Sequence, residues 1–195
     1  MLEKLIELDK ILFTWLNGFH SPFWDTVMWH ISGKKEWIPI YILIAAIIIY
    51  KYRWRSILII ITIALVITLS DRLSVVCFKN VFHRLRPSHN PELADTIHLI
   101  RDYYGGKYGF ISSHATNTYS FAVFLSLLFR NKWATFVLLF WATLVSYSRI
   151  YLGVHYPGDI LGGLIFGSLL GYVMYQLMIL FETYVIPKIK SLFQN

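Results

Sequence analysis

The chain has 195 residues, of which 56% are hydrophobic and 15% are charged, and its mean hydropathy is +0.54. Because a soluble domain usually carries about 25% charged residues, this composition excludes an ordinary soluble domain and indicates an integral membrane protein. The net charge of +7 does not indicate nucleic-acid binding, since the basic residues flank apolar stretches, as expected at membrane interfaces. A single cysteine, Cys77, excludes an internal disulfide and a cysteine-based zinc site.

Residues 1–35 are expected to lie at the membrane surface. Apolar residues recur with helical spacing from Leu2 to Phe13, and charged residues occupy the opposite face, which predicts an amphipathic interfacial helix. No cleavable signal peptide is expected, because charges interrupt the apolar stretch. Residues 11–31 are a weak candidate for a membrane span, since glycine, proline and aspartate interrupt them.

Five later stretches approach the length of about 20 apolar residues that a bilayer-spanning helix needs. They cover about residues 36–52, 56–78, 113–129, 133–149 and 159–181. The chain is therefore predicted to be an all-α integral membrane protein, a bundle of about five transmembrane helices plus amphipathic N-terminal interfacial helices. It is expected to form one membrane-embedded domain over residues 1–195, and six spans are the alternative count.

Basic residues predict the orientation of the bundle. The tight turns KYRWR (51–55) and RNK (130–132) join consecutive spans and are expected to be cytoplasmic under the positive-inside rule. Lys188 and Lys190 would place the C-terminus on the same side. The connection 79–112 and the turn near 150–158 then lie on the opposite side. For a multi-pass protein of a bacterial inner (plasma) membrane, this side is the periplasm or the outside.

The last span carries Gly163, Gly167 and Gly171 at four-residue spacing. Such a ridge of small residues lets helices approach closely. Packing inside one chain is the favoured interpretation, and a dimer interface is the alternative. A monomer and a homodimer are equally compatible with the sequence.

Three polar clusters are expected at span ends on the outer side. Their chemistry-bearing residues are Lys79, Arg86, Ser112, Ser113, His114, Arg149, His155 and Asp159. Cations can bind an anionic group, one histidine can attack while another transfers protons, and an aspartate can hold a histidine in the required tautomer. Ordinary structural roles exist for some of them, such as snorkelling for Lys79 or helix capping for Ser112 and Ser113. A capped helix N-terminus is also an anion site, so the two interpretations support each other.

Further charged residues lie near the first cluster. Arg84 is interpreted as a snorkelling residue or a contact to lipid head groups. Arg72 and Lys79 are seven residues apart and are expected to share a helix face. An unpaired Asp71 inside a span would be costly, so Asp71, with Arg72 beside it, is expected to support the site by neutralising one of its arginines.

The clusters resemble the three-part signature of the type 2 phosphatidic acid phosphatase family, membrane lipid phosphatases related to vanadium haloperoxidases. KNVFHRLRP (79–87) and SRIYLGVHYPGD (148–159) match the first and third parts at every defining position. The second part usually reads Pro-Ser-Gly-His, and here it is ISSH (111–114), with Ser113 in place of glycine. The resemblance spans about residues 71–175.

The resemblance implies a two-step phosphoryl transfer that needs no metal or other cofactor. His155 would attack phosphorus and form a phosphohistidine, and Asp159 would orient His155. His114 would protonate the leaving oxygen and then activate water. The phosphoryl oxygens would be held by Lys79, Arg86, Ser112, Ser113 and Arg149. The sequence also lacks a carboxylate cluster suited to Mg²⁺.

The implied substrate is a lipid phosphate at the outer face, with membrane lipids as the other partners and no nucleic acid. Undecaprenyl pyrophosphate or phosphatidylglycerol phosphate is favoured, and lipid A is the alternative. A non-catalytic transporter or scaffold with the same fold is the alternative of another class, although it has no need for two separately placed histidines. Vanadate-dependent peroxidase chemistry is disfavoured by the strongly transmembrane character.

Overall fold

The computed structural model describes residues 2–187, which form helices joined by loops, without a β-strand in this range. The main helices are α1 (Leu2–Asn17), α2 (Pro22–Ser32), α3 (Ile38–Tyr52), α4 (Arg55–Leu73), α6 (Ser113–Phe129), α7 (Lys132–Tyr151) and α8 (Pro157–Leu180). A π-helical turn, Ser74–Lys79, and the short α5 (Asn80–Phe82) continue α4, and a second π-helical turn, Phe181–Val185, continues α8. Lys188 and Lys190 lie outside the described residues.

Within residues 2–187, three helical segments are long and apolar enough to cross a membrane: Arg55–Phe82, Lys132–Tyr151 and Pro157–Val185. Helix α3 is apolar but has 15 residues, and α6 has 17 residues. The predicted all-α membrane bundle is confirmed, whereas the number of spans stays a prediction.

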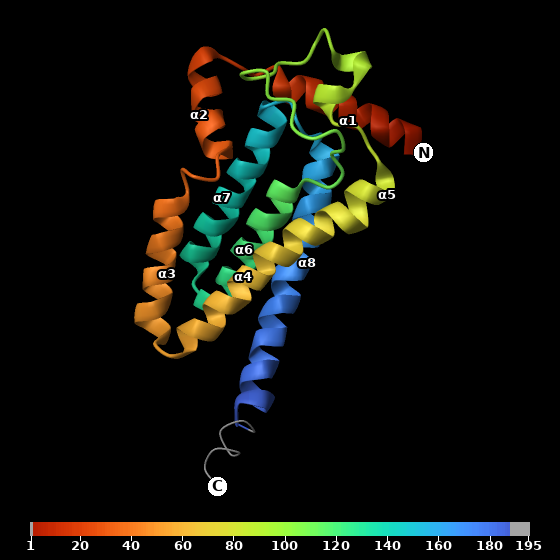
Figure 1. Ribbon diagram of the computed structural model, residues 1–195. Helices are drawn as coiled ribbons and strands as arrows, with labels where there is room; N and C mark the ends of the chain where they lie inside the picture. Colours follow the sequence, from red (N-terminus) through yellow and green to blue (C-terminus); the bar gives the residue numbers. More distant parts are fainter. Residues whose placement is uncertain (1, 188–195) are drawn as a thin grey trace.

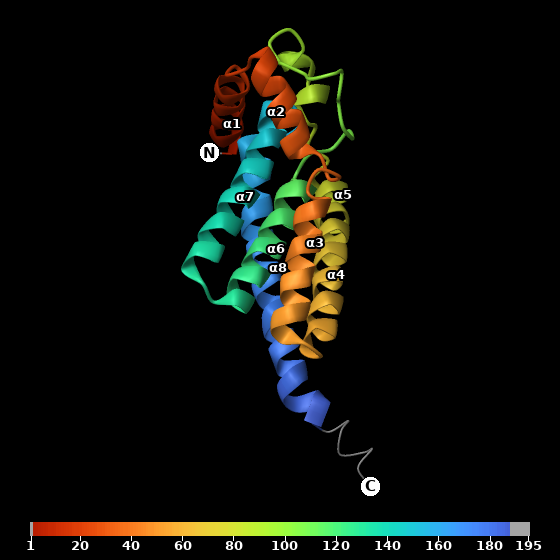
Figure 2. The same ribbon diagram turned by 90° about the vertical axis from the view of Figure 1, so that its left-hand side faces the viewer.

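Helix α6 lies at the centre of the bundle and packs against α4, α7 and α8 (Figures 1 and 2). None of its residues is exposed, and Thr116, Ser120 and Phe124 on one of its faces each have 0% of their surface exposed. The hydroxyls of Thr116 and Ser120 donate to backbone carbonyls of α6 itself or its N-cap, which satisfies these polar groups inside the bundle. Neighbouring helices therefore fix the position of both ends of α6.

The glycine ridge of α8 lies against α6. A Cβ atom at Gly167 would come within 2.5 Å of the backbone oxygen of Thr116, and one at Gly163 within 2.9 Å of the oxygen of Ser112. Only glycine permits this approach of two backbones. The ridge thus serves packing inside the chain, as predicted.

Helices α1 and α2 lie with the long loop 83–112 at one end of the bundle, opposite the end where the chain leaves α8 (Figure 1). Helix α1 buries Phe13 and exposes Leu5, Leu8 and Trp15, as expected for an interfacial helix. Residues 11–31 do not form one span, because the chain breaks between Asn17 and Pro22.

Candidate active site

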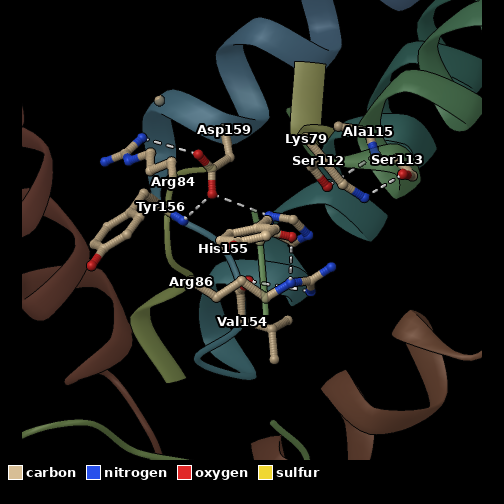
Figure 3. A network of polar contacts seen from close by, with 12 residues as sticks. Lys79, Arg84, Arg86, Ser112, Ser113, Ala115, Val154, His155, Tyr156 and Asp159 are labelled. Carbon is tan, nitrogen blue, oxygen red and sulfur yellow. Dashed lines mark hydrogen bonds and ion pairs between the residues drawn. The ribbon is translucent and has the colours of Figure 1, made fainter. Parts of the chain in front are cut away.

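The three polar clusters meet at the end of the bundle that carries α1 (Figures 1 and 3). The segment that continues α4 ends here, and α6 begins here. Helix α7 also ends here and α8 begins here. Because consecutive helices of the bundle run in opposite directions, residues far apart in sequence come together at this end.

His155 and Asp159 form a buried pair, with 1% and 0% of their surfaces exposed. His155 Nδ1 lies 3.2 Å from Asp159 Oδ2, which also accepts the backbone N–H of Tyr156 at 3.1 Å. Asp159 sits in the first turn of α8 directly after Pro157 and Gly158, a favoured helix start. A carboxylate oxygen facing Nδ1 favours the tautomer with its proton on Nδ1, which leaves the Nε2 lone pair of His155 free.

The ring of His155 is expected to be neutral at neutral pH. Burial, together with the positive charges of Arg86 and Arg149, lowers the pKa of His155 well below its usual value. A neutral imidazole keeps the lone pair that a nucleophile or a base needs.

Two buried guanidinium groups accompany this histidine. Arg86 is 8% exposed and donates to the backbone oxygens of Tyr108 (3.2 Å) and Val154 (3.4 Å). Arg149 is 3% exposed and donates to the hydroxyls of Tyr103 (3.2 Å) and Ser32. Among residues 2–187 neither arginine has an ion-pair partner, and the buried Nε of Arg149 has no acceptor.

Buried cations without a counter-ion are costly unless a ligand supplies the negative charge. Their hydrogen bonds to neutral oxygens hold the two guanidinium groups in place without cancelling their charge. An anionic ligand such as a phosphoryl group would supply both the missing charge and an acceptor for the Nε of Arg149.

Lys79 reaches the site from the π-helical turn, and its Nζ donates to Ser113 Oγ at 2.6 Å. Ser74 contacts the same hydroxyl at 2.7 Å. The serine that replaces the family's glycine therefore provides a partner for Lys79. Ser112 caps α6 by accepting the N–H of Ala115, as the structural interpretation predicted. Its own N–H donates to the backbone oxygen of Asp159, which joins the starts of α6 and α8.

His114 stands apart from the other site residues in one respect. Its imidazole ring makes no hydrogen bond with another residue among 2–187, although its backbone oxygen accepts the hydroxyl of Thr118. The ring lines a cavity of about 390 Å³ between α3, α4, α6 and α7. Ser32 and Lys34 lie at the cavity wall near His114, and the remaining wall is mostly apolar, with Ile48 and Ile63 among its residues. His114 therefore lies where a mostly apolar cavity meets the polar site.

Two expectations are wrong in this structure. Asp71 and Arg72 are exposed, and the side chain of Asp71 forms no ion pair with residues 2–187. With a rise of 1.5 Å per residue, Asp71 lies roughly 24 Å along the axis of α4 from its start. Arg84 is not a snorkelling residue, because its guanidinium pairs with Asp159 and Asp9.

Sequence reasoning missed several contributors. Asp9, Ser32 and Tyr103 each contact a cation of the site, and no spacing pattern marks them. In the described part of the chain, no group of three or more His, Cys, Asp or Glu residues is placed to hold a metal ion.

Fold and site together define a class of protein, an all-helical membrane protein with a buried, cationic site that contains two histidines. Residues 54–181 match the family model of the PAP2 superfamily, and the chain belongs to this family of membrane lipid phosphatases. The family resemblance of the three motifs is thereby confirmed.

Named relatives agree with this assignment. The chain is 40% identical over 178 residues to a lipid A 4'-phosphatase of Bacteroides thetaiotaomicron, covering 90% of this chain and 79% of that protein. It is 31% identical over 179 residues to an undecaprenyl-diphosphatase of Sulfolobus acidocaldarius, covering 90% and 76%. The crystal structure of a transmembrane PAP2 type phosphatidylglycerolphosphate phosphatase from Bacillus subtilis superposes with a TM-score of 0.68 at 24% identity. The superposition covers 93% of this chain and 89% of the Bacillus subtilis chain, so the two proteins share a fold.

Proposed function

We propose that the protein removes the 4'-phosphate of lipid A through a phosphohistidine formed on His155. The observation that carries the chemistry is the pair of buried guanidinium groups, Arg86 and Arg149, which lack a counter-ion among the described residues beside a neutral histidine. The similarity over 90% of the chain to a lipid A 4'-phosphatase favours the substrate. Lipid A thereby takes precedence over the polyprenyl and glycerol phosphates that the sequence alone favoured.

In the first step, the Nε2 lone pair of His155 attacks phosphorus and forms an N–P bond. The P–O bond to the sugar breaks, and His114 donates a proton to the departing sugar oxygen. Asp159 accepts the Nδ1–H and stabilises the positive charge that develops on the ring. In the second step, His114 takes a proton from water, the water oxygen attacks phosphorus, and the N–P bond breaks to release phosphate.

The phosphoryl oxygens carry the charge that builds up in both steps. Arg86, Arg149 and Lys79 supply positive charge at fixed positions, and the N-terminus of α6 at Ser113 adds backbone N–H groups and the positive end of the helix dipole. Each preorganised donor of this kind typically contributes about 3 kcal/mol of transition-state stabilisation.

The surroundings of the site support a lipid as the substrate. The cavity of about 390 Å³ extends from His114 into apolar side chains of α3 and α4, so an acyl chain can lie there while the phosphate stays at the polar end. The basic turns at 51–55 and 130–132 lie at the far ends of the helices that begin or end at the site. This distribution supports a site on the periplasmic or outer face of an inner membrane.

A polyprenyl diphosphate is the second candidate substrate. The similarity to an undecaprenyl-diphosphatase favours it. The position of Lys34 at the cavity wall also favours it, since an additional cation there suits a second phosphate group.

The test is a phosphate-release panel with the full chain in detergent. Lipid A, undecaprenyl pyrophosphate, phosphatidylglycerol phosphate and phosphatidic acid are compared, and mass spectrometry identifies which phosphate lipid A loses. We expect the highest kcat/KM for lipid A, with loss of the 4'-phosphate. A higher value for undecaprenyl pyrophosphate would replace lipid A as the substrate.

The mechanism is tested by two histidine variants. His155→Ala is expected to abolish phosphate release from every substrate, whereas His89→Ala, in the loop, serves as the matched control and retains it. Wild-type turnover in His155→Ala would exclude the phosphohistidine.

A further inference from the structure

Arg84 joins two carboxylates that are far apart in sequence. Its Nη1 donates to Asp159 Oδ1 at 3.0 Å, and its Nη2 donates to Asp9 Oδ2 at 2.6 Å. Asp159 is fully buried, so this guanidinium supplies the positive charge next to it (Figure 3). The other oxygen of Asp159 faces His155. The carboxylate is therefore held through Oδ1 by Arg84, and through Oδ2 by His155 and the backbone N–H of Tyr156.

Asp9 also contacts the turn that places Asp159. Asp9 Oδ1 accepts the backbone N–H of Gly158 at 2.7 Å. A Cβ atom at Gly158 would lie 2.6 Å from Asp9 Oδ2, so the glycine permits this close approach. One side chain of α1 thus holds both the start of α8 and the cation that pairs with Asp159.

Other contacts keep Arg84 and α1 in place. The guanidinium of Arg84 lies over the ring of Tyr156, 4.2 Å from its centroid, and that ring packs edge-on against Phe13 of α1. Asn17, also of α1, donates to the backbone oxygens of Ile150 and Tyr151 at the end of α7. Helix α1 is therefore docked by Phe13 and Asn17 independently of Asp9.

We propose that Asp9 and Arg84 are positioning residues for the nucleophile. Arg84 fixes the Asp159 carboxylate so that Oδ2 accepts the Nδ1–H of His155, and Asp9 fixes Arg84. The planar guanidinium with two rigidly spaced donors suits this bridging role. Without Asp9, the Nη2 of Arg84 loses its acceptor and Arg84 holds Oδ1 of Asp159 less rigidly, so the carboxylate can rotate about the single backbone N–H of Tyr156 that still holds Oδ2. The inference rests on the proposed role of His155.

The first test is kinetic. In Asp9→Asn the amide oxygen can still accept the N–H of Gly158, but the amide nitrogen cannot accept from Arg84. We expect kcat to fall about tenfold or more, with KM within about twofold of wild type. Arg84→Lys is expected to do the same, because one ammonium group cannot bridge both carboxylates in this geometry.

The matched control is Lys10→Ala. Lys10 is the next residue of α1, and it forms an ion pair with Glu92 of the same long loop, without contacting Arg84 or Asp159. The kcat of the Lys10→Ala variant is expected to equal that of wild type. An equal loss of kcat in Lys10→Ala and Asp9→Asn would overturn the proposal, because docking of α1 in general would then explain the effect.

The second measurement needs no substrate. Long-range ¹H–¹⁵N spectra of the histidines in detergent report which ring nitrogen of His155 carries the proton. We expect Nδ1–H in wild type and in Lys10→Ala, and a shift toward Nε2–H in Asp9→Asn and Arg84→Lys. Unchanged spectra in both variants would overturn the proposal.

The two measurements separate the two hypotheses. If wild type hydrolysed no lipid phosphate, the proposed function would fail, and the spectra would still decide the positioning role. If Asp9→Asn did not fold, Arg84→Lys would decide by the same measurements.

Discussion

Replacing Gly167 by alanine tests whether the contact between α6 and α8 sets the geometry of the site. The new Cβ would lie 2.5 Å from the backbone oxygen of Thr116, whereas ordinary van der Waals contact begins at 3.4 Å. The obstacle is backbone, which cannot rotate away, so the two helices must part by about an ångström. Overpacking of this kind costs about 1 to 3 kcal/mol, and the rigid obstacle places Gly167→Ala near the upper value.

Two effects on measurable quantities follow. Alanine is favoured over glycine in a helix by about 1 kcal/mol, so the net loss is about 2 kcal/mol. For a chain of this size, such a loss lowers Tm by roughly 4 to 8 °C. Since α6 carries His114 and α8 carries Asp159, a displacement of about 1 Å also lowers kcat by about a hundredfold.

Thermal unfolding in detergent and phosphate release measure both effects. Gly106→Ala is the control, because a Cβ there meets no atom within 4 Å, and it should resemble wild type. A Gly167→Ala variant with the Tm and kcat of wild type would refute the argument that backbone contact fixes the site.

The remaining predictions concern charge and pH. Arg149→Lys should lower kcat about a hundredfold in the phosphate-release assay, because an ammonium cannot hold Tyr103 and a phosphoryl oxygen in the same planar geometry. The pKa of His155 lies well below 6.5. Protonation of His155 should therefore decrease kcat/KM only at pH values below 6.5. Folding stability should also decline below that pH, where the unfolded chain binds a proton that the folded ring resists. A limb centred above pH 7 would contradict this. Excess EDTA should leave turnover unchanged, and loss of activity with rescue by Mg²⁺ would contradict a metal-free reaction. Asp71→Asn should retain wild-type turnover, because this residue is exposed.

The sequence could predict which motif residues meet, because helices of alternating direction bring every second connection to the same end. Lys79, Arg149 and Asp159 follow from this rule and from the lengths of the apolar stretches. The expectation for Asp71 failed for a physical reason. Its side chain is exposed and pairs with no arginine among residues 2–187, and a lone charge in an apolar stretch does not indicate which side of its helix faces the site.

Other features depend on tertiary contacts that leave no local signal. Arg84 has the composition and place of a snorkelling residue, and only the path of the loop 83–112 turns it inward. Asp9 stands among other charged residues of an amphipathic helix, and nothing in that pattern distinguishes the carboxylate that reaches Gly158. The roles of Arg84 and Asp9 depend on how one element docks on another. Hydrophobic periodicity and motif spacing in the sequence carry no information about that docking.

The cavity beside His114 has walls of unequal stiffness. Helix α6 is held by backbone contact with the glycines of α8, whereas α3 packs chiefly against α4 and leaves Ile42, Leu43 and Ile49 exposed. The free energy of local opening is lowest where a segment makes the fewest buried contacts. For a lipid that entered sideways from the bilayer, we therefore expect α3 to be the wall that yields, while the groups around His155 stay anchored to the contact between α6 and α8.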